Sequence, residues 1–246
     1  NRGVLLFGGY QWDAMSGAEI AQGHNSAFVD KQNRAFVVYH TRFSNGGEGH
    51  QVRVHQLFLN DEGWLMAAPF EFDGETITDE AIASKASIAD TDIAGDYQFM
   101  RHQYGQNTKA KAFETPVNIT LHADGTITGA EKGTWKRTAG TDYIHLTINN
   151  VVYRGVLVKQ TIDYTNIPAI AISALSSSSG SLTIGQNSFT YQQEVWAVKA
   201  DAKAAIKYTL NKLTVPFSNG ATLNAVPTLP TQGKMGAKIA WKSSDT

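Results

Sequence analysis

The sequence lacks cysteine altogether among its 246 residues. Without cysteine the chain can form neither disulfide bonds nor thiolate metal sites, so any metal ion must be held by histidine, carboxylate, carbonyl or water ligands. An excess of charge is missing too, because 21 basic side chains stand against 22 acidic ones. We therefore expect no nucleic-acid partner and no attraction to an anionic membrane surface.

Long hydrophobic segments are also absent. No apolar run approaches the roughly 18 residues that a membrane-spanning helix needs, so we expect no membrane partner. The residues of a folded core are present, since 42% of the chain is hydrophobic and 10% is aromatic. The chain begins at Asn1 and ends in what resembles a strand. We expect a segment of a longer polypeptide, and the absence of cysteine fits an exported bacterial protein.

Residues 1–75 carry short apolar runs of strand length that are rich in Val, Phe, Tyr and Leu. Polar turns separate the last four runs, at Lys31–Arg34, Ser44–Gly47 and Asn60–Gly63. This spacing predicts four strands in meander order, which form one antiparallel sheet. The second strand has consecutive apolar residues at Phe36–Tyr39. Both of its faces are therefore predicted to be buried, as in a propeller blade packed between its neighbours.

Residues 92–199 form a second β-rich region, after a polar connector at about 76–91. Hairpin signals occur at Asp124-Gly125 and Asn149-Asn150, each between alternating apolar segments. Many strands joined by tight turns predict a small closed barrel or a sandwich. The alanines and lysines at Ala200–Tyr208 then predict a short helix or linker.

Residues 209–246 contain several prolines and turn residues. They resemble the first part of an immunoglobulin-like β-sandwich, but the segment is too short to complete one.

The signatures of common catalytic sites do not occur. The sequence has no GxSxG, GxxxxGK[ST], strand-linked GxGxxG or HExxH motif, so serine-hydrolase, nucleotide and zinc-protease chemistry lose their usual supports. Hydrolysis of a glycoside needs two carboxylates on opposite sides of the scissile bond. Most carboxylates of the first domain stand in predicted turns, where solvation alone explains them, and we assign none of them a catalytic role. The candidates are Asp13, Glu19, Asp30, Glu48, Asp61, Glu62, Glu71 and Asp73.

Four of the seven histidines lie in the first domain, at spacings that match no zinc signature. His40 and His55 fall within predicted strands beside arginines, so we interpret them as polar groups that are satisfied between sheets. His50 follows a glycine-rich loop and is predicted to be solvated. Glu48 and His50 could act as an acid and a base, but a single loop without a second anchored carboxylate is weak support.

His24 is different, because Gly23 leaves room beside it and Asn25-Ser26 offers polar neighbours at the start of a strand. On local grounds two readings stay open, a buried hydrogen-bonded histidine and a ligand. The five tryptophans could likewise stack on sugar rings, although core positions explain each of them more simply.

Residues 23–70, GHNSAFVDKQNRAFVVYHTRFSNGGEGHQVRVHQLFLNDEGWLMAAPF, resemble the final blade of the endo-arabinanases of glycoside hydrolase family 43. The resemblance rests on GHNS, YHTRF, the GE-H-VRVHQ run, and NDEGW followed by AP. Residues 92–199 are similar to the C-terminal β-barrel of such enzymes, and 209–246 to the start of a bacterial immunoglobulin-like module. The resemblance implies an all-β chain: the last blade of a five-bladed propeller (1–75), a lipocalin-like barrel (92–199) and a partial immunoglobulin-like segment.

The resemblance also implies a function. Family members cleave α-1,5-linked arabinan with inversion, using two aspartates and a glutamate of earlier blades. These carboxylates would lie upstream of Asn1, so we expect no catalytic or cofactor-binding residue here and an inactive chain on its own. His24, the histidine of GHNS, is implied as the one protein ligand of a mostly water-coordinated calcium ion. The implied partner is arabinan or an arabino-oligosaccharide, and the parent protein is expected to be secreted or at the cell surface, and monomeric.

Two other roles for the barrel remain open at this stage. It could be a carbohydrate-binding module that acts independently of the catalytic part, or a structural brace for the propeller. Because its aromatic residues alternate as core residues do, bracing is the preferred reading.

Overall fold

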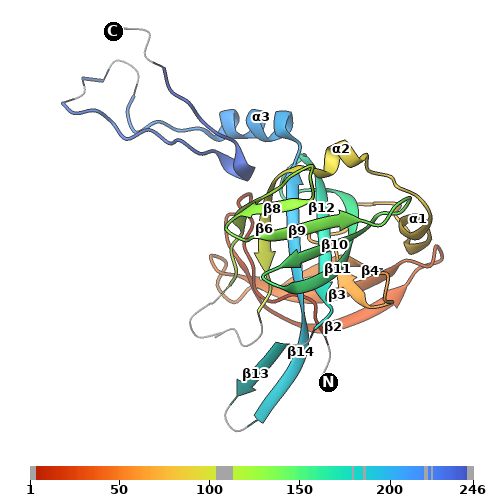
Figure 1. Cartoon of the computed structure of the whole chain (residues 1–246). Helices are drawn as coiled ribbons and strands as arrows, with labels where there is room; N and C mark the ends of the chain where they lie inside the picture. The colour runs from red at the N-terminus through yellow and green to blue at the C-terminus, as the bar shows by residue number, and fades with distance from the viewer. Residues whose placement is uncertain are drawn as a thin grey trace.

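The computed structural model describes residues 4–103, 113–178, 180–184, 187–218, 221–222 and 224–242, with the backbone alone described at 180–184 and 187–190. The fold is all-β, as predicted. One large sheet closes into a barrel, and a separate four-stranded sheet lies against it (Figure 1).

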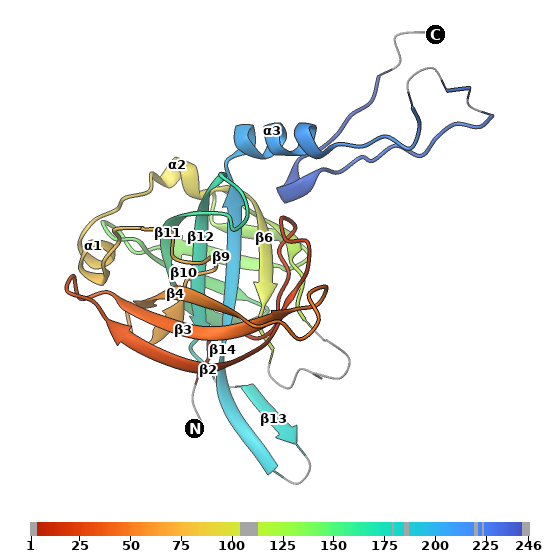
Figure 2. The same ribbon diagram turned by 180° about the vertical axis from the view of Figure 1, so that it is seen from behind.

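The barrel consists of strands that pair antiparallel with their neighbours in sequence, and β14 pairs with β6 to close the ring. Its strands are β6 (Gly95–Arg101), β7 (Val117–Leu121), β8 (Thr126–Gly129), β9 (Gly133–Arg137), β10 (Tyr143–Ile148), β11 (Val151–Thr161), β12 (Pro168–Ser176) and β14 (Asn187–Ala200). Two short strands also pair with β14, namely β1 (Val4–Leu5), in parallel, and β13 (Gly180–Ile184). The β13–β14 hairpin projects from the barrel (Figure 2).

Tight turns set the register of the barrel, at the positions that the sequence predicted. Asn149 and Asn150 both have positive φ, 50° and 64°, and connect β10 directly to β11. This is the geometry of a two-residue hairpin whose twist matches that of the flanking strands. Gly125, with φ 85°, makes the turn before β8.

The barrel is filled by its own side chains. Along β10, Ile144, Leu146 and Ile148 are all fully buried and alternate with less buried residues. They belong to a core cluster that also includes Tyr97 from β6 and Val195 from β14. The inside of the barrel is thus a packed core, and the barrel's outer surface is the part available to other segments.

The four-stranded sheet has the predicted meander order and consists of β2 (Glu19–Val29), β3 (Ala35–Phe43), β4 (Gln51–Leu59) and β5 (Leu65–Ala67). β2 is an edge strand. It begins six residues before the predicted start at Asn25, and its exposed C-terminal half contrasts with the buried β3. Figure 2 shows the sheet crossing the barrel wall.

The sheet and the barrel share a second hydrophobic core. From the sheet it contains Tyr39 and Phe58, and from the outer wall of the barrel it contains Val156 and Trp196, all nearly inaccessible to solvent. The backbone at Ala67 completes the junction. Its N–H donates to Glu194 Oε1 at 2.9 Å, and its carbonyl accepts from Trp196 Nε1 at 3.0 Å. The two sheets are therefore packed together as one unit.

The connector after the sheet contains two short helices, α1 (Asp79–Ser84) and α2 (Asp90–Ile93). The hydroxyl of Thr78 accepts a hydrogen bond from Ala81 N at 3.2 Å and caps the first of them. Ile82 and Ile93 are the buried anchors of the two helices, so the connector runs along the protein surface while staying attached to it.

The short helix or linker predicted at Ala200–Tyr208 is a helix, α3 (Ala202–Lys212), capped by Asp201, whose Oδ1 accepts from Ala204 N at 2.8 Å. Beyond it, the described residues contain a short 3-10 helix, η2 (Lys234–Gly236), and one isolated bridge between Gln232 and Lys238, with no named strand. The immunoglobulin-like nature of 209–246 stays a prediction. None of the described helices is both long and apolar enough to cross a membrane.

Candidate functional site

The site singled out by the sequence, His24, lies on edge strand β2 at an irregularity in its pairing with β3. The register shifts twice, between Ile20 and Gly23 and again between Gly23 and Ser26. His24 has φ 43° and Ala21 has φ 54°, a backbone conformation that costs energy for residues with a side chain. The bulge turns the His24 side chain out of the regular alternation, and the residue is exposed.

Three imidazoles gather at this bulge. The rings of His24 and His40 have centroids 5.1 Å apart, and those of His40 and His50 are 4.7 Å apart. Desolvation, followed by the neighbouring His50 and His24 rings, lowers the pKa of His40. A neutral ring can use its free nitrogen as a ligand. Among the described residues, no hydrogen bond engages any of these three rings, so their nitrogens remain available.

Gly23 lies beside the ring of His40. A Cβ at this position would lie 3.5 Å from His40 Nε2, which is ordinary van der Waals contact, and Gly23 does not have a positive φ. A small side chain would therefore fit beside His40. The positive φ falls on His24 itself, one residue later than the glycine.

The other histidines of the sheet behave differently from one another. His55 is buried, with Nδ1 2.7 Å from the carbonyl oxygen of Ala68 and Nε2 3.1 Å from the hydroxyl of Tyr39. Burial lowers its pKa to about 4, so it stays neutral and is satisfied between sheets, as predicted. His40 differs from that interpretation, because within the described residues its ring has no hydrogen-bond partner and lies against the rings of His24 and His50. His50 is exposed, as predicted. Glu48 pairs with Arg42.

A charge network around the buried Glu19, at the junction of the sheet and the barrel, was not found from the sequence. Arg53 forms ion pairs with Glu19 and Glu71, both of them carboxylates on the barrel side of the sheet. The hydroxyl of Tyr39 donates to Glu19 Oε2 at 3.1 Å, and Arg53 also donates to the hydroxyl of Tyr164, in a barrel turn, at 3.1 Å. The available signal was a charged residue within each of two strands, Glu19 on β2 and Arg53 on β4, which flank β3 in the sheet.

Burial dominates the protonation of this network. It raises the pKa of Glu19 to about 7 in spite of the nearby Arg53, and it raises the pKa of Asp163 well above its usual value. Asp163 accepts a hydrogen bond from Glu71 N at 3.1 Å, which ties a barrel turn to the end of the sheet. Three acidic groups share one guanidinium here, so near-neutral pH keeps part of them protonated.

The remaining carboxylates of the first domain hold turns or contact the barrel. Asp30 Oδ1 accepts from the backbone N–H groups of Gln32 and Arg34, both at 2.9 Å. Asp61 Oδ2 lies 2.7 Å from His145 Nε2 and 2.9 Å from Arg154 of the barrel. The tryptophans divide between the core and the surface: Trp12 and Trp196 are buried, whereas Trp64 and Trp241 are each 42% exposed.

Few side chains of the described residues are placed to bind a metal ion. They contain no group of three or more histidine, aspartate or glutamate side chains placed to hold an ion. His24 offers one exposed imidazole that lacks a hydrogen-bond partner among them. This fits an ion that takes one protein ligand and completes its coordination with water, and it fits no cage of protein ligands.

Comparison with known proteins relates part of this chain to one enzyme family. Residues 69–185 match the C-terminal lipocalin-like domain of glycoside hydrolase family 43. This range begins just after β5 and ends before β14, the strand that closes the barrel.

Among curated relatives, the extracellular endo-α-(1→5)-L-arabinanase of Thermotoga petrophila is 42% identical over 146 residues, which is 57% of this chain and 28% of the relative. Extracellular endo-α-(1→5)-L-arabinanase 2 of Bacillus subtilis is 37% identical over 162 residues, 64% of this chain and 32% of the relative. The chain thus spans less than a third of the length of these relatives.

Solved structures agree with this placement. The glycoside hydrolase family 43 YxiA protein of Bacillus licheniformis superposes with a TM-score of 0.63 at 31% identity, over 78% of this chain and 38% of that one. Endo-1,5-α-L-arabinanase of Thermotoga petrophila gives 0.61 at 35% identity, over 80% and 38%. Together with the matched residues 69–185, these likenesses show that the chain carries the C-terminal lipocalin-like domain of glycoside hydrolase family 43.

Proposed function

We propose that this chain is the C-terminal part of a secreted endo-arabinanase that cleaves α-1,5-linked arabinan with inversion. In this proposal the four-stranded sheet is the last blade of a five-bladed propeller, and the catalytic carboxylates belong to blades outside the chain. The proposal is supported by the named activity of the relatives and by the fraction of their length that the chain spans. The parent protein would act on arabinan outside the cell, as a monomer.

Within that enzyme, the barrel would brace the last blade. The observation that carries this role is the core shared by the sheet and the barrel wall, with Trp196 and Glu194 of β14 bonded to the backbone of Ala67. Apolar side chains fill the described interior of the barrel, and part of its outer wall packs against the four-stranded sheet. The brace would keep the blade in position in a closed propeller, where its free edge must meet a neighbour.

His24 would hold calcium in the assembled enzyme. Its exposed ring, which lacks a hydrogen bond within the described residues, suits an ion otherwise coordinated by water. Calcium prefers oxygen ligands, and in this proposal the water molecules supply them beside a single imidazole nitrogen. When bound, the ion would supply positive charge near the carboxylates of other blades and so lower their pKa values. The part of this chain would be to position one imidazole, on the β2 bulge, toward the centre of the propeller.

The proposal is tested by comparing two proteins on linear arabinan, with reducing ends measured over time. The chain alone should release none above the buffer rate, because it is proposed to lack the paired carboxylates. The product of the complete reading frame should cleave arabinan internally, and NMR of the first product should show inversion of the anomeric centre. Hydrolysis by the chain alone, or none by the complete protein, would overturn the proposal.

A further inference from the structure

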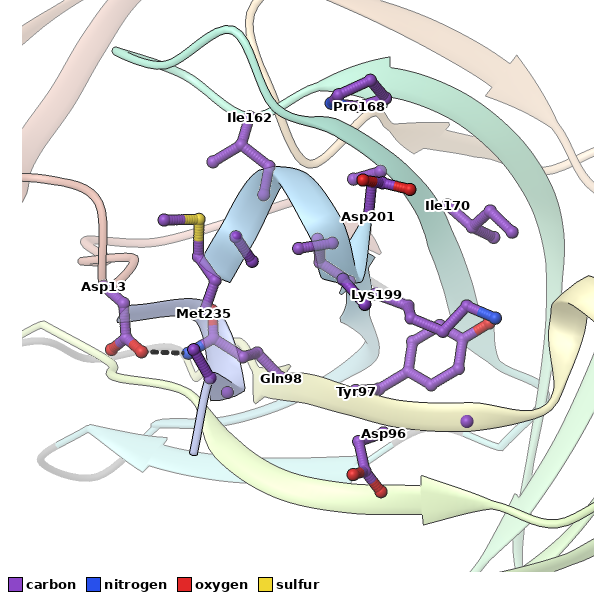
Figure 3. Close-up of a pocket in the computed structure, with 18 of the residues that line it drawn as sticks. Asp13, Asp96, Tyr97, Gln98, Ile162, Pro168, Ile170, Lys199, Asp201 and Met235 are labelled. Atoms are coloured by element: carbon purple, nitrogen blue, oxygen red, sulfur yellow. Dashed lines mark hydrogen bonds between the residues drawn. The ribbon is translucent and has the colours of Figure 1, made fainter. Parts of the chain in front are cut away.

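A cavity of ≈ 1330 Å³ lies outside the barrel, where α3 and the segment around η2 meet β6, β12 and β14 (Figure 3). Ordinary small-molecule sites have volumes of about 300–1,000 Å³, so this one has room for an extended ligand. It lies on a different part of the molecule from the His24 bulge and shares none of that site's residues. Nothing in the arabinanase proposal makes use of it.

One wall of the cavity is held in place by close packing of the C-terminal segment against α3. Met235 of η2 is only 8% exposed, and a Cβ on Gly233 would lie 2.2 Å from the Thr209 side chain. Only glycine can therefore approach α3 this closely. The hydroxyl of Thr209 also donates to the Lys234 carbonyl, at 3.4 Å. The wall is a built part of the fold.

The lining combines apolar side chains with hydrogen-bonding groups. The aliphatic surface comes from Ile206, which is 51% exposed, and the half-buried Ile170, while the buried Ile162, Ala205 and Met235 pack behind them. Opposite them, Gln98 Nε2 donates to Asp13 Oδ2, as the dashed line in Figure 3 marks. Within the described residues these two side chains make no other hydrogen bond, so Asp13 Oδ1 and Gln98 Oε1 remain as acceptors. Aliphatic C–H faces and acceptors for hydroxyl groups are what a sugar chain requires.

The charge of the lining decides between classes of polysaccharide. The carboxylates outnumber the amines that line it in the described part of the chain: Asp13, Asp73, Glu75, Asp92, Asp96 and Asp201 against Lys159, Lys199 and Lys238. Two of these amines are already engaged by backbone carbonyls. Lys159 donates to Ser87 at 3.1 Å and Lys199 to Ala94 at 2.9 Å. An anionic chain would meet net repulsion here, and a neutral one would not.

We infer that this cavity is a non-catalytic binding site for a neutral, linear oligosaccharide. That the bound oligosaccharide is a segment of α-1,5-linked arabinan rests on the proposed function. The site would hold the polymer on the barrel while another segment of the same chain is cleaved, and so would raise the effective concentration of substrate. Tyr97, which also lines the cavity, is buried in the barrel core. Binding therefore depends on hydrogen bonds and the aliphatic surface.

The test is isothermal titration of the intact chain with a linear α-1,5-arabino-oligosaccharide and, separately, with an oligogalacturonide of equal length. Two matched substitutions on α3 locate the site. Ile206→Asp places a charge on the cavity lining, and Leu210→Asp makes the same change one turn further along, outside it. Both side chains are more than half exposed, 51% and 65%, so both variants should fold, which circular dichroism would verify.

The neutral ligand should bind the unmodified chain and the Leu210→Asp variant equally. Ile206→Asp should weaken binding by about tenfold or more, and the anionic ligand should give no heat of binding. Absence of arabino-oligosaccharide binding, equal binding by the two variants, or equal affinity for the oligogalacturonide would each overturn the inference. Because binding is measured on the chain alone and hydrolysis on the complete protein, failure of this site and failure of the proposed activity can be told apart.

Discussion

Glu19 offers a direct measurement of how burial competes with an ion pair. Its side chain is inaccessible to solvent, accepts from the hydroxyl of Tyr39, and lies 3.4 Å from Arg53 Nε. Burial outweighs Arg53, and the pKa rises from 4.5 to about 7. Replacement by glutamine keeps the shape and the hydrogen-bond acceptor and removes the titration. The variant Glu19→Gln therefore isolates the protonation of this one group.

The sign and size follow from proton linkage. Between pH 4.5 and about 7 the folded state holds a proton on Glu19 that the unfolded state has lost. Within this window the contribution of Glu19 to the free energy of unfolding falls as the pH rises, and it levels off above the folded pKa. A separation of about 2.5 pK units corresponds to about 3 kcal/mol at 1.36 kcal/mol per unit. The free energy of unfolding of Glu19→Gln, taken relative to the unmodified protein, should thus rise by about 3 kcal/mol between pH 4.5 and pH 8.

The assay is urea unfolding followed by tryptophan fluorescence at pH 4.5, 6 and 8, with the difference in unfolding free energy between variant and unmodified protein taken at each pH. Glu48→Gln is the matched control, because it removes a carboxylate whose side chain is 86% exposed; its difference should stay within about 0.5 kcal/mol. A Glu19→Gln difference that is the same at all three pH values would mean that Arg53 keeps Glu19 ionised in the folded protein, and the reasoning from burial would be refuted.

Three further outcomes are expected. Trp196→Ala removes the indole that joins the barrel wall to the sheet and should lower the free energy of unfolding by about 3–5 kcal/mol in urea titrations. A loss of less than about 1 kcal/mol would contradict the shared core. Arg53→Ala leaves the buried Glu19 and the partly exposed Glu71 without their cation and should cost about 3–5 kcal/mol at pH 8. The cost should be smaller at pH 5, where protonation of Glu19 relieves the loss, and a pH-independent cost would argue against this. In the complete protein, millimolar calcium should raise the melting temperature, and His24→Ala should abolish this rise whereas Leu210→Asp should retain it. An unchanged rise in the His24 variant would show that His24 is not a ligand of the ion.

Much of the fold was predictable because its signals are local. The turns between β2, β3, β4 and β5 are marked by Gly, Asn and Asp. In the barrel hairpins, positive φ values occur at Asn149, Asn150 and Gly125, within the two dipeptides that marked the turns. The helix after the barrel followed from its alanines and lysines, and the structure adds Asp201 as its cap. Alternation along β10 marked the inner face of the barrel.

What escaped prediction depends on contacts between distant segments. The connector seemed featureless because α1 is a single capped turn of helix held by one buried residue, Ile82. The network around Arg53 requires knowledge of which sheet face meets the barrel, and a single sequence does not give that. At the candidate site, residue type suggested a histidine with space beside it, but the positive φ of His24 and its neighbours His40 and His50 come from a bulge that pairing alone creates.

Strand β14 has a consequence for the order of events during synthesis. It pairs with β6, nearly a hundred residues earlier in the chain. It also carries Trp196 and Glu194, whose side chains form hydrogen bonds with the backbone of Ala67. The ring cannot close, and the four-stranded sheet has no wall to settle on, until residue 198 has left the ribosome. Pairings so distant in sequence form slowly, because the intervening loop must be closed first. The apolar face of the nascent sheet therefore lacks its barrel wall while residues 68–198 are synthesised, which makes this interval the stage at which aggregation competes with folding.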